Sequence, residues 1–346
     1  MPDPKSPLPA AIASLVHRRS LSEEQTAQVF GAMMRGEASP VQIAALLVGL
    51  RVKGETADEV AGAARAMRGA MVRVEGGPDV VDTCGTGGGL IGTFNISTAA
   101  ALVAAGAGAS VAKHGNRSFT SKSGSADVLE ALGVVLPRSA AAAAQVLREA
   151  CVTFMFAPHF HPAMRHVGPV RGELGVPSVM NLLGPLSNPA GAQRQVLGVA
   201  DRDRAPLLAA ALARLGSVHA LVVHGRIGMD EISPQGPTDV WEIRGGEVET
   251  WVLDPEDYGH AIADVGALAG GTPAENAQRI ERLVERGEGD PSARAAVVLN
   301  AGAALYVAGR AAGYRAGVEQ AAQSLAAGDA ARALERLRRV SASTSG

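Results

Sequence analysis

Two short apolar segments, Asp79–Thr83 and Ser110–Ala112, each run directly into a loop of small and polar residues. The first leads into the glycine cluster of the string DTCGTGGG, and the second leads into KHGNRS. Between them, the string STAAALVAAGAGA has the composition of a helix. A strand, a helix and a second strand in this order predict a largely parallel sheet with helices packed on it.

The first loop has the composition of a phosphate-binding loop. Its glycines lack a Cβ atom, so the backbone can turn sharply and bring N–H groups against the oxygens of a ligand. Asn95, Ser97 and Thr98 follow at the expected start of the helix, where unpaired N–H groups and the helix dipole favour an anion. The string GTGG taken alone fits a plain strand-to-helix turn equally well.

The second loop adds cations and small hydrogen-bond donors, namely Lys113, His114, Asn116, Arg117, Ser118, Ser121, Lys122 and Ser123. Ligands of parallel α/β sheets bind beyond the carboxyl ends of the strands, and both loops lie at such ends. Two loops of this kind therefore favour a phosphate site over a plain turn.

The alternation of strands and helices continues from about residue 76. We expect strands at 79–83, 110–112, 134–136, 152–156, 195–199 and 218–223, and a β-hairpin over 241–253. We expect helices at 125–131, 139–150, 204–215, 274–288, 292–308 and 318–337. The pattern predicts an α/β fold with a central, mostly parallel sheet flanked by helices.

Residues 8–73 have the pattern of consecutive helices instead. Ser22 and Ser39 are suitable N-caps, and Thr56 with Glu59 forms a capping box. Apolar residues at helical spacing give a stripe that must pack on another element. We therefore expect a small N-terminal helical domain over 8–74, joined by part of about 166–190, and a large α/β domain over 76–346.

Composition argues against several classes of protein. The formal net charge is −2 and the pI is near 6.5, so no global basic field attracts nucleic acid or an anionic membrane. Aromatic residues make up only 3% of the chain, which argues against base-stacking surfaces. Cys84 and Cys151 are too few for a disulfide framework, and the start of the chain is a poor signal peptide. We expect a soluble, cytoplasmic protein with reduced thiols.

The middle of the chain carries two further candidate sites. Arg171 lies in a segment rich in proline and glycine; it suits bidentate binding of a carboxylate, and it equally suits a surface salt bridge. His161 and His166 in the same segment fit packing or capping roles, and we assign neither to catalysis. Asp230 and Glu231 follow an expected strand; they fit a solvated face or, beside phosphates, hard oxygen ligands for Mg²⁺.

The chain resembles the anthranilate phosphoribosyltransferase family over nearly its whole length. The resemblance rests on the strings GTGG, TFNIST, KHGNRSFTSKSGSADVLEALG, HPAMRHVGPVRGELG, NLLGPLSNPA and GMDEIS, which keep the family's order. It implies transfer of a phosphoribosyl group from phosphoribosyl pyrophosphate to the amine of anthranilate in tryptophan biosynthesis. It also implies Mg²⁺ as the cofactor and a homodimer formed through the helical domain.

The resemblance also implies roles for individual residues. Lys113 and His114 are the expected catalytic residues; Lys113 is the one whose loss should impair catalysis most, and His114 should line the channel between the two ligands. Anthranilate would contact Gly85, Asn116 and Arg171, and Mg²⁺ would be held by Ser97, Asp230 and Glu231. The expected phosphoribosyl pyrophosphate site comprises Gly85, Gly88, Gly89, Thr93, Asn95, Ile96, Ser97, Thr98, Lys113, His114, Gly115, Asn116, Arg117, Ser118, Ser121 and Ser125.

One departure from the family pattern lies in the first loop. Gly89 and Leu90 stand where the family has Asp and Gly, so one carboxylate is missing and we expect an altered Mg²⁺ dependence. Three alternatives remain open: a pyrimidine nucleoside phosphorylase, a transferase for another aromatic amine, and a non-catalytic relative that binds nucleic acid. The strings KHGNR and PVRGELG favour the transferase over the phosphorylase.

Overall fold

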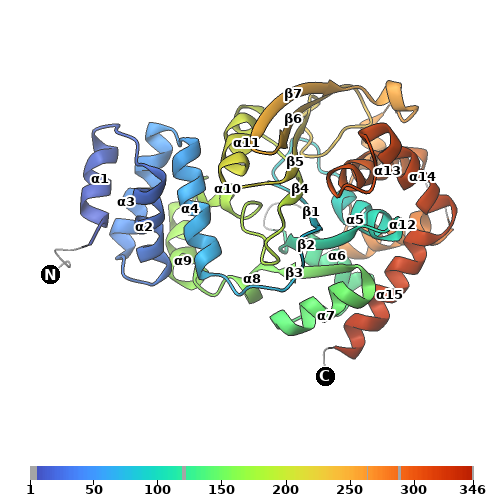
Figure 1. The fold of residues 1–346 in the computed structure, drawn as a ribbon, viewed down its shortest axis with the longest axis horizontal. Helices are drawn as coiled ribbons and strands as arrows, with labels where there is room; N and C mark the ends of the chain where they lie inside the picture. Colours follow the sequence, from blue (N-terminus) through green and yellow to red (C-terminus); the bar gives the residue numbers. More distant parts are fainter. Residues whose placement is uncertain (1–5, 119–121, 263, 287–289, 345–346) are drawn as a thin grey trace.

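The N-terminal segment folds into four helices whose starts are set by local capping. The computed structural model describes residues 6–118, 122–262, 264–286 and 290–344. The side chains of Ser22, Ser39 and Thr56 each accept a hydrogen bond from the backbone N–H three residues later, which confirms the predicted caps. The four helices are α1 Leu8–Val16, α2 Glu23–Met34, α3 Pro40–Lys53 and α4 Ala57–Ala70 (Figure 1).

A buried carboxylate joins these helices to one another. Glu59 has no exposed surface, and its two oxygens accept hydrogen bonds from Leu21 N at 2.9 Å, Thr56 N at 2.8 Å and Lys53 Nζ at 2.9 Å. A buried charge is tolerated when it is paired and fully hydrogen-bonded. Glu59 therefore ties the start of α4 to the end of α3 and to the entry of α2.

The rest of the chain builds a seven-stranded sheet in the order β3-β2-β1-β4-β5-β6-β7. The first five strands pair in parallel, and β6 and β7 form an antiparallel hairpin at the edge. This topology confirms the predicted fold class. The strands are β1 Val80–Gly85, β2 Ser110–Gly115, β3 Val152–Phe156, β4 Arg194–Gly198, β5 His219–Gly225, β6 Thr238–Arg244 and β7 Glu247–Leu253.

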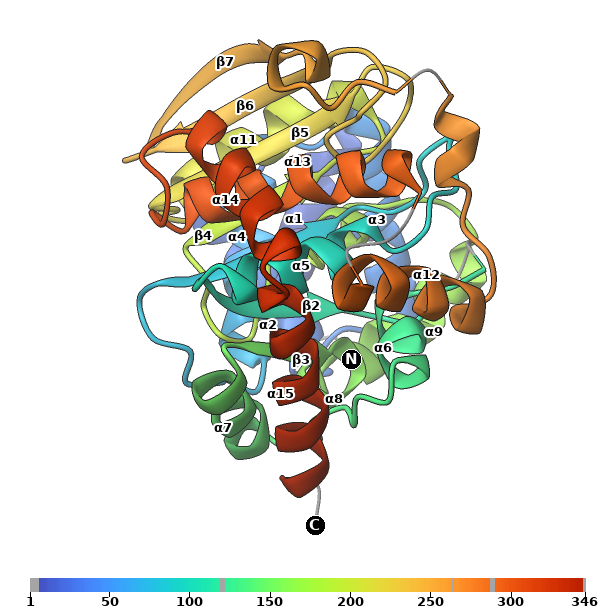
Figure 2. The same ribbon diagram turned by 90° about the vertical axis from the view of Figure 1, so that its right-hand side faces the viewer.

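Helices cover both faces of the sheet. Figure 2 shows α5, α12, α13, α14 and α15 in front of one face; α7 and α11 contact strands from the other face, and the helical domain packs on α11 through α4. Successive residues of β5 point to opposite faces of the sheet and so belong to different hydrophobic cores. Leu221 and Val223 lie in the core that includes α5 and α13, whereas Val222 lies in the core that includes α4 and α11. The helices are α5 Ile96–Gly106, α6 Ser125–Ala131, α7 Ala140–Ala150, α8 Ala157–Phe160, α9 Met164–Leu174, α10 Met180–Leu183, α11 Ala205–Arg214, α12 Pro273–Arg286, α13 Pro291–Val307, α14 Tyr314–Ala326 and α15 Asp329–Ser343, with 3₁₀ turns η1 Arg202–Arg204, η2 Pro255–Tyr258 and η3 Val265–Leu268.

Two predicted elements are wrong. Residues 134–136 form no strand, because their N–H groups have other partners. Val134 N donates a hydrogen bond to Leu129 O at the end of α6, and Val135 N donates to the Ser341 hydroxyl. The predicted helix over 318–337 is two helices, since Gly328 has a φ of 71° and ends the continuity between α14 and α15.

Two short helices from the middle of the chain lie against the helical domain. Helix α9 contacts α2 and α3, and α10 contacts α4. The position of the domain boundary stays a prediction. Across the described residues, the structure contains no helix that is both long and apolar enough to cross a bilayer.

Candidate active site

The glycine loop leaves the carboxyl end of β1 and turns through backbone conformations that favour glycine. Gly87 and Gly88 have φ values of 69° and 78°, in the left-handed region. Thr86 N donates a hydrogen bond to Gly198 O at 2.9 Å, which anchors the loop on the end of β4. Gly87 N donates to Asp230 Oδ2 at 2.9 Å, so the loop contacts the predicted metal residues directly.

The turn after β5 reaches β1 by crossing over the end of β4. A Cβ atom on Gly198 would lie 1.7 Å from Asp230 O, and one on Gly85 would lie 2.7 Å from Asp230 Oδ2. Position 198 therefore requires glycine, because the clash is with backbone atoms, whereas a Cβ atom at position 85 would displace the Asp230 carboxylate. Beyond this crossing, Glu231 Oε1 accepts a hydrogen bond from Ser97 N at 3.1 Å. The structure thus brings Ser97, Asp230 and Glu231 together at the start of α5.

These three residues offer a donor set that suits Mg²⁺. Burial raises the pKa of both carboxyl groups, and the charge of Asp230 raises that of Glu231 further. A cation between them would relieve this cost. In the described part of the chain, no cluster of three or more His, Cys, Asp and Glu side chains forms a complete metal site. Mg²⁺ needs few protein carboxylates when substrate phosphates supply other ligands, so the residues fit this ion.

Lys113 lies beneath the glycine loop rather than open to solvent. It is only 3% exposed, and its Nζ donates to Ser97 Oγ at 3.1 Å and to the carbonyl oxygen of Thr83. Burial lowers the pKa of Lys113, whereas the nearby carboxyl group of Asp82 acts in the opposite direction. The Lys113 cation therefore lies behind the first turn of α5 and touches it through Ser97.

Asp82 is a buried acid that sequence reasoning missed. It has no exposed surface, and its Oδ1 accepts a hydrogen bond from His114 N at 3.2 Å. Its Oδ2 is buried without a hydrogen-bond partner among the described residues, and burial raises the pKa of the carboxyl group to about 6. The available signal was an aspartate inside the apolar strand VVDTC.

The second loop is joined to the first by side-chain hydrogen bonds. Asn95 Nδ2 donates to Ser123 O at 3.2 Å, and the Ser123 hydroxyl bonds Asn95 Oδ1 at the same distance. Arg117, in contrast, pairs with Asp127 and Glu130 of α6, at 2.6 and 2.7 Å. The Arg117 guanidinium is therefore paired with carboxylates of α6, whereas we predicted that it binds phosphate oxygens.

Other predicted residues of the second loop lie close by. Asn116 Oδ1 accepts a hydrogen bond from Arg117 N at 2.8 Å, and Ser118 N lies 3.4 Å from Asp127 Oδ2. Gly115 ends β2, and Ser125 begins α6. Ser121 lies outside the described residues.

His114 forms a buried pair with His161. Their Nε2 atoms lie 3.1 Å apart, so one ring donates and the other accepts. Burial lowers the pKa of His114 to about 3 and that of His161 to about 4. Both imidazoles are therefore neutral at pH 7. The segment HFHPAMR gave no sign of this contact with a strand 47 residues earlier.

Arg171 lies on α9, which begins three residues after His161. Its side chain is half-buried, and burial lowers its pKa. Within the described ranges, no hydrogen bond or ion pair occupies its guanidinium. A half-buried arginine without a partner has lost part of its hydration and gains from binding an anion.

The remaining predicted residues lie at the entry to α5. Thr93 bridges to Ala269, Asn95 precedes the first helical residue, and Ile96 is buried in the core. The hydroxyl of Thr98 is buried and has no hydrogen-bond partner among the residues described.

The departure from the family pattern lies directly beside the acidic turn. A Cβ atom on Gly89 would lie 3.2 Å from Asp230 Oδ1. Leu90 N donates to Gly228 O at 3.0 Å, while 89% of the Leu90 side chain is exposed. Any side chain at position 89 therefore points at the predicted metal residues.

Comparisons with known proteins give a consistent result. The α/β domain model of a glycosyl transferase family matches residues 77–331, and the helical bundle domain model of the same family matches residues 9–71. The chain is 53% identical over 321 residues to an anthranilate phosphoribosyltransferase of Rubrobacter xylanophilus, covering 93% of this chain and 94% of the relative. An enzyme of the same name from Symbiobacterium thermophilum is 50% identical over 330 residues, which cover 95% of this chain and 96% of the relative.

Solved structures agree with these relatives. The anthranilate phosphoribosyltransferase of Thermus thermophilus superposes with a TM-score of 0.90 at 45% identity, covering 96% of this chain and 99% of the other. The enzyme of Saccharomyces cerevisiae, solved in complex with PRPP and Mg, superposes with a TM-score of 0.88 at 28% identity, covering 98% and 99%.

Proposed function

Because the chain belongs to the anthranilate phosphoribosyltransferase family, we propose that this site joins phosphoribosyl pyrophosphate to anthranilate. The products are N-(5-phosphoribosyl)anthranilate and pyrophosphate, and the step belongs to tryptophan biosynthesis. The observation that carries the proposal is the meeting of the glycine loop with Ser97, Asp230 and Glu231 at the start of α5.

The chemistry at this place is mainly electrostatic. Departure of pyrophosphate leaves an oxocarbenium-like sugar and a highly charged anion, which positioned donors stabilise. Gly87 N and Ser97 N donate to Asp230 and Glu231, so the two predicted metal ligands lie at the glycine loop and the first turn of α5, where an anion is favoured. Lys113 adds a positive charge behind Ser97. Mg²⁺ held by Ser97, Asp230 and Glu231 would neutralise charge on the leaving group.

Residues of the second loop and α9 serve the acceptor. The aromatic amine of anthranilate is uncharged at neutral pH and already nucleophilic, so positioning matters more than a strong base. We assign the carboxylate of anthranilate to Arg171, supported by its unpaired, half-buried guanidinium within the described part of the chain. Asn116 and Gly85 orient the ring, and His114 lines the channel between the two ligands as a neutral imidazole.

The phosphoribosyl pyrophosphate site comprises the residues around these loops. Three features support it: two glycines with positive φ, the Asn95–Ser123 link between the loops, and the buried cation of Lys113. We retain for it the set predicted from the sequence, including Arg117, which would exchange Asp127 and Glu130 for phosphate oxygens on binding.

A homodimer through the helical domain is part of the proposal. Val16, Val41, Val48 and Val52 on α1 and α3 are 39–78% exposed, and an apolar stripe of this kind is typical of an interface. The three valines of α3 share one face because they are spaced by seven and four residues. We place the enzyme in the cytoplasm, supported by the free thiols of Cys84 and Cys151.

The test follows the fluorescence of anthranilate on mixing with the protein, phosphoribosyl pyrophosphate and Mg²⁺. We expect fluorescence loss that needs both substrates. Arg171→Ala should raise the KM for anthranilate by about tenfold or more, because one charge-assisted contact is lost. Arg165→Ala is the matched control, since Arg165 is exposed on the same helix and, among the described residues, its guanidinium bonds only His166. Unchanged fluorescence with the wild-type protein would contradict the proposed reaction.

A further inference from the structure

Residues 92–95, which connect the glycine loop to α5, are hydrogen-bonded to residues that lie about 175 positions later in the chain. Residues 92–95 form neither helix nor extended strand. They pair instead with residues 268–270, at the end of η3 and just after it. Phe94 N donates to Leu268 O at 2.9 Å, and Gly270 N donates to Gly92 O at 2.9 Å. The conformation of this segment therefore depends on what holds residues 267–271.

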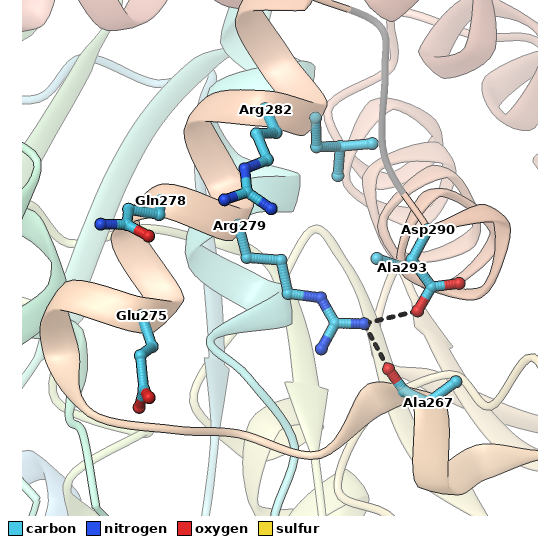
Figure 3. A pocket seen from close by; sticks show the side chains of 8 residues that line it. Ala267, Glu275, Gln278, Arg279, Arg282, Asp290 and Ala293 are labelled. Carbon is cyan, nitrogen blue, oxygen red and sulfur yellow. Dashed lines mark hydrogen bonds and ion pairs between the residues drawn. The ribbon is translucent and has the colours of Figure 1, made fainter.

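Arg279 of α12 holds both sides of this pairing. Its guanidinium lies 4.4 Å from the centre of the Phe94 ring, a cation–π contact. The same group donates to Ala269 O at 3.3 Å, to Ala267 O, and to Asp290 Oδ2 at 2.9 Å. Figure 3 shows the side chain extended from α12 between Ala267 and Asp290. One side chain thus fixes the ring of Phe94, the segment after η3 and the start of α13.

Asn276 makes a second connection from the same helix. It is 3% exposed, its Nδ2 donates to Asn95 Oδ1 at 3.0 Å, and its Oδ1 accepts from Gly271 N at 2.8 Å. Asn95 is also the residue that bonds Ser123 of the second loop. The Asn276 amide is therefore linked to both phosphate loops through one partner.

We propose that Arg279 and Asn276 are positioning residues for phosphoribosyl pyrophosphate, holding residues 92–97 so that Ser97 keeps its place at the phosphate site. The inference rests on the proposed function. Neither residue needs to touch the substrate: Arg279 acts through Phe94, and Asn276 acts through Asn95. Both contacts lie within a few residues of Ser97, so a shift of the segment is passed directly to the phosphate site.

A cavity of about 600 Å³ beside Arg279 supplies a matched control. It lies between α12 and the start of α13 and is lined by Ala267, Glu275, Gln278, Arg279, Arg282, Leu283, Asp290 and Ala293 (Figure 3). Arg282 lines the same cavity from the next turn of α12, is exposed, and has no hydrogen bond or ion pair in the described ranges. It shares the helix, the cavity and the charge of Arg279 but not the contact with Phe94.

The experiment compares Arg279→Met, Arg279→Lys and Arg282→Met with the wild-type enzyme. Steady-state kinetics give kcat and both KM values, and calorimetry gives the Kd of phosphoribosyl pyrophosphate. Arg279→Met should raise the KM and Kd for phosphoribosyl pyrophosphate about tenfold, the usual scale for a group that orients a binding residue. The KM for anthranilate should change less than about twofold, because neither Arg279 nor its partner Phe94 is among the residues assigned to anthranilate. Arg279→Lys, which keeps the cation over Phe94, should recover part of the loss.

Different results would contradict the positioning role of Arg279 and the proposed function. Equal phosphoribosyl pyrophosphate constants in Arg279→Met and Arg282→Met, with an active wild-type enzyme, overturn the inference alone. A parallel loss for both substrates together with a lower melting temperature shows a merely structural role and also overturns it. If Arg279→Met does not fold, Asn276→Leu replaces it, with the same selective loss expected. A wild-type protein that does not bind phosphoribosyl pyrophosphate overturns the proposed function itself.

Discussion

Lys113 is buried, and the charges of Asp82 and Glu231 both act to raise its pKa against the effect of burial. Its positive charge therefore offsets carboxylates that would otherwise repel a pyrophosphate group at the glycine loop. His114, the next residue of the strand, is neutral and contributes shape rather than charge. At the scale of single residues, we expect this difference in charge to make Lys113 more important for catalysis than His114.

Replacing Lys113 should therefore impair turnover more than replacing His114. Lys113→Met removes the cation behind Ser97, and kcat should fall by about 10²–10³, as for other single electrostatic groups in a buried site. His114→Gln should cost less. Initial rates at saturating substrates measure kcat, and melting temperatures show whether each variant is folded. A larger loss in His114→Gln would contradict this ranking.

Gly89 offers a second test at residue scale. Gly89→Asp places a carboxylate next to Asp230 Oδ1, which would lie 3.2 Å from the new Cβ. The added negative charge should strengthen Mg²⁺ binding, so half-maximal activity should be reached at a lower Mg²⁺ concentration. Gly89→Asn has nearly the same size without the charge and serves as the control. An unchanged Mg²⁺ profile in Gly89→Asp would sink the idea that this position sets metal dependence.

The outer edge of the sheet is held to α13 by one carboxylate. Glu242 of β6 lies 2.9 Å from His219 Nε2 of β5, accepts from Trp251 Nε1 of β7 at 2.9 Å, and accepts from the Tyr306 hydroxyl at 2.8 Å. At the scale of secondary elements, three strands and a helix thus share a single acid. Such a network is worth more when every partner is present.

This network predicts a specific loss of stability in acid. Burial alone would raise the pKa of Glu242, but the hydrogen bonds from His219, Tyr306 and Trp251 lower it from 4.5 to about 2. A carboxyl group with a lowered pKa in the folded state stabilises it above the ordinary pKa. That stability is lost as the pH falls from 4.5 through about 2.

Urea unfolding between pH 7 and pH 2 measures the effect. Glu242→Gln should lower the free energy of unfolding at pH 7 by about 1.5–3 kcal/mol, the usual value of a hydrogen bond to a charged group. The variant should also lose less stability than the wild-type protein between pH 4.5 and 2. Identical acid profiles for the two proteins would show that Glu242 does not contribute to this pH dependence.

At the scale of the whole molecule, two ion pairs join the helical domain to the α/β domain: one links Glu55, just before α4, to Arg204 of η1, and the other links Asp58 of α4 to Arg214 of α11. Arg204 Nη1 lies 2.6 Å from Glu55 Oε2, and Arg214 Nε lies 2.5 Å from Asp58 Oδ1. These contacts use the face of the helical domain that meets the sheet, as Figure 1 shows for α4 and α11. The exposed valines of α1 and α3 remain outside this contact and are available to a second copy of the chain.

A charge on this apolar stripe should therefore dissociate the dimer. Val41→Glu removes apolar area and buries a carboxylate in the proposed interface, so the protein should sediment as a monomer at concentrations where the wild type is a dimer. Val252→Glu is the control, because Val252 is 52% exposed on β7, a strand that lies outside the helical domain. A dimer that persists in Val41→Glu would place the interface elsewhere.

Local patterns predicted most of the elements and the chemistry of the loops. The capped helices of the N-terminal domain, the strands that run into loops and the hairpin at Gly245-Gly246 depend on neighbours within a few residues. The same kind of signal failed where distant partners decided the outcome. Val134–Leu136 has the composition of a strand, but its Val135 N–H group donates a hydrogen bond to the Ser341 hydroxyl of α15 instead of to a neighbouring strand.

The sequence by itself determined the fold class, the glycine loop after the first strand and the cationic loop after the second, and it pointed to Asp230 and Glu231 but not to Asp82. Only the tertiary structure decided that the turn after β5 crosses Gly198 to meet Gly85, that His161 meets His114, and that Arg279 packs on Phe94. The physical reason is range. Backbone conformation and capping depend on adjacent residues, whereas close approach and burial depend on elements that are far apart in the chain and meet only after the sheet has assembled.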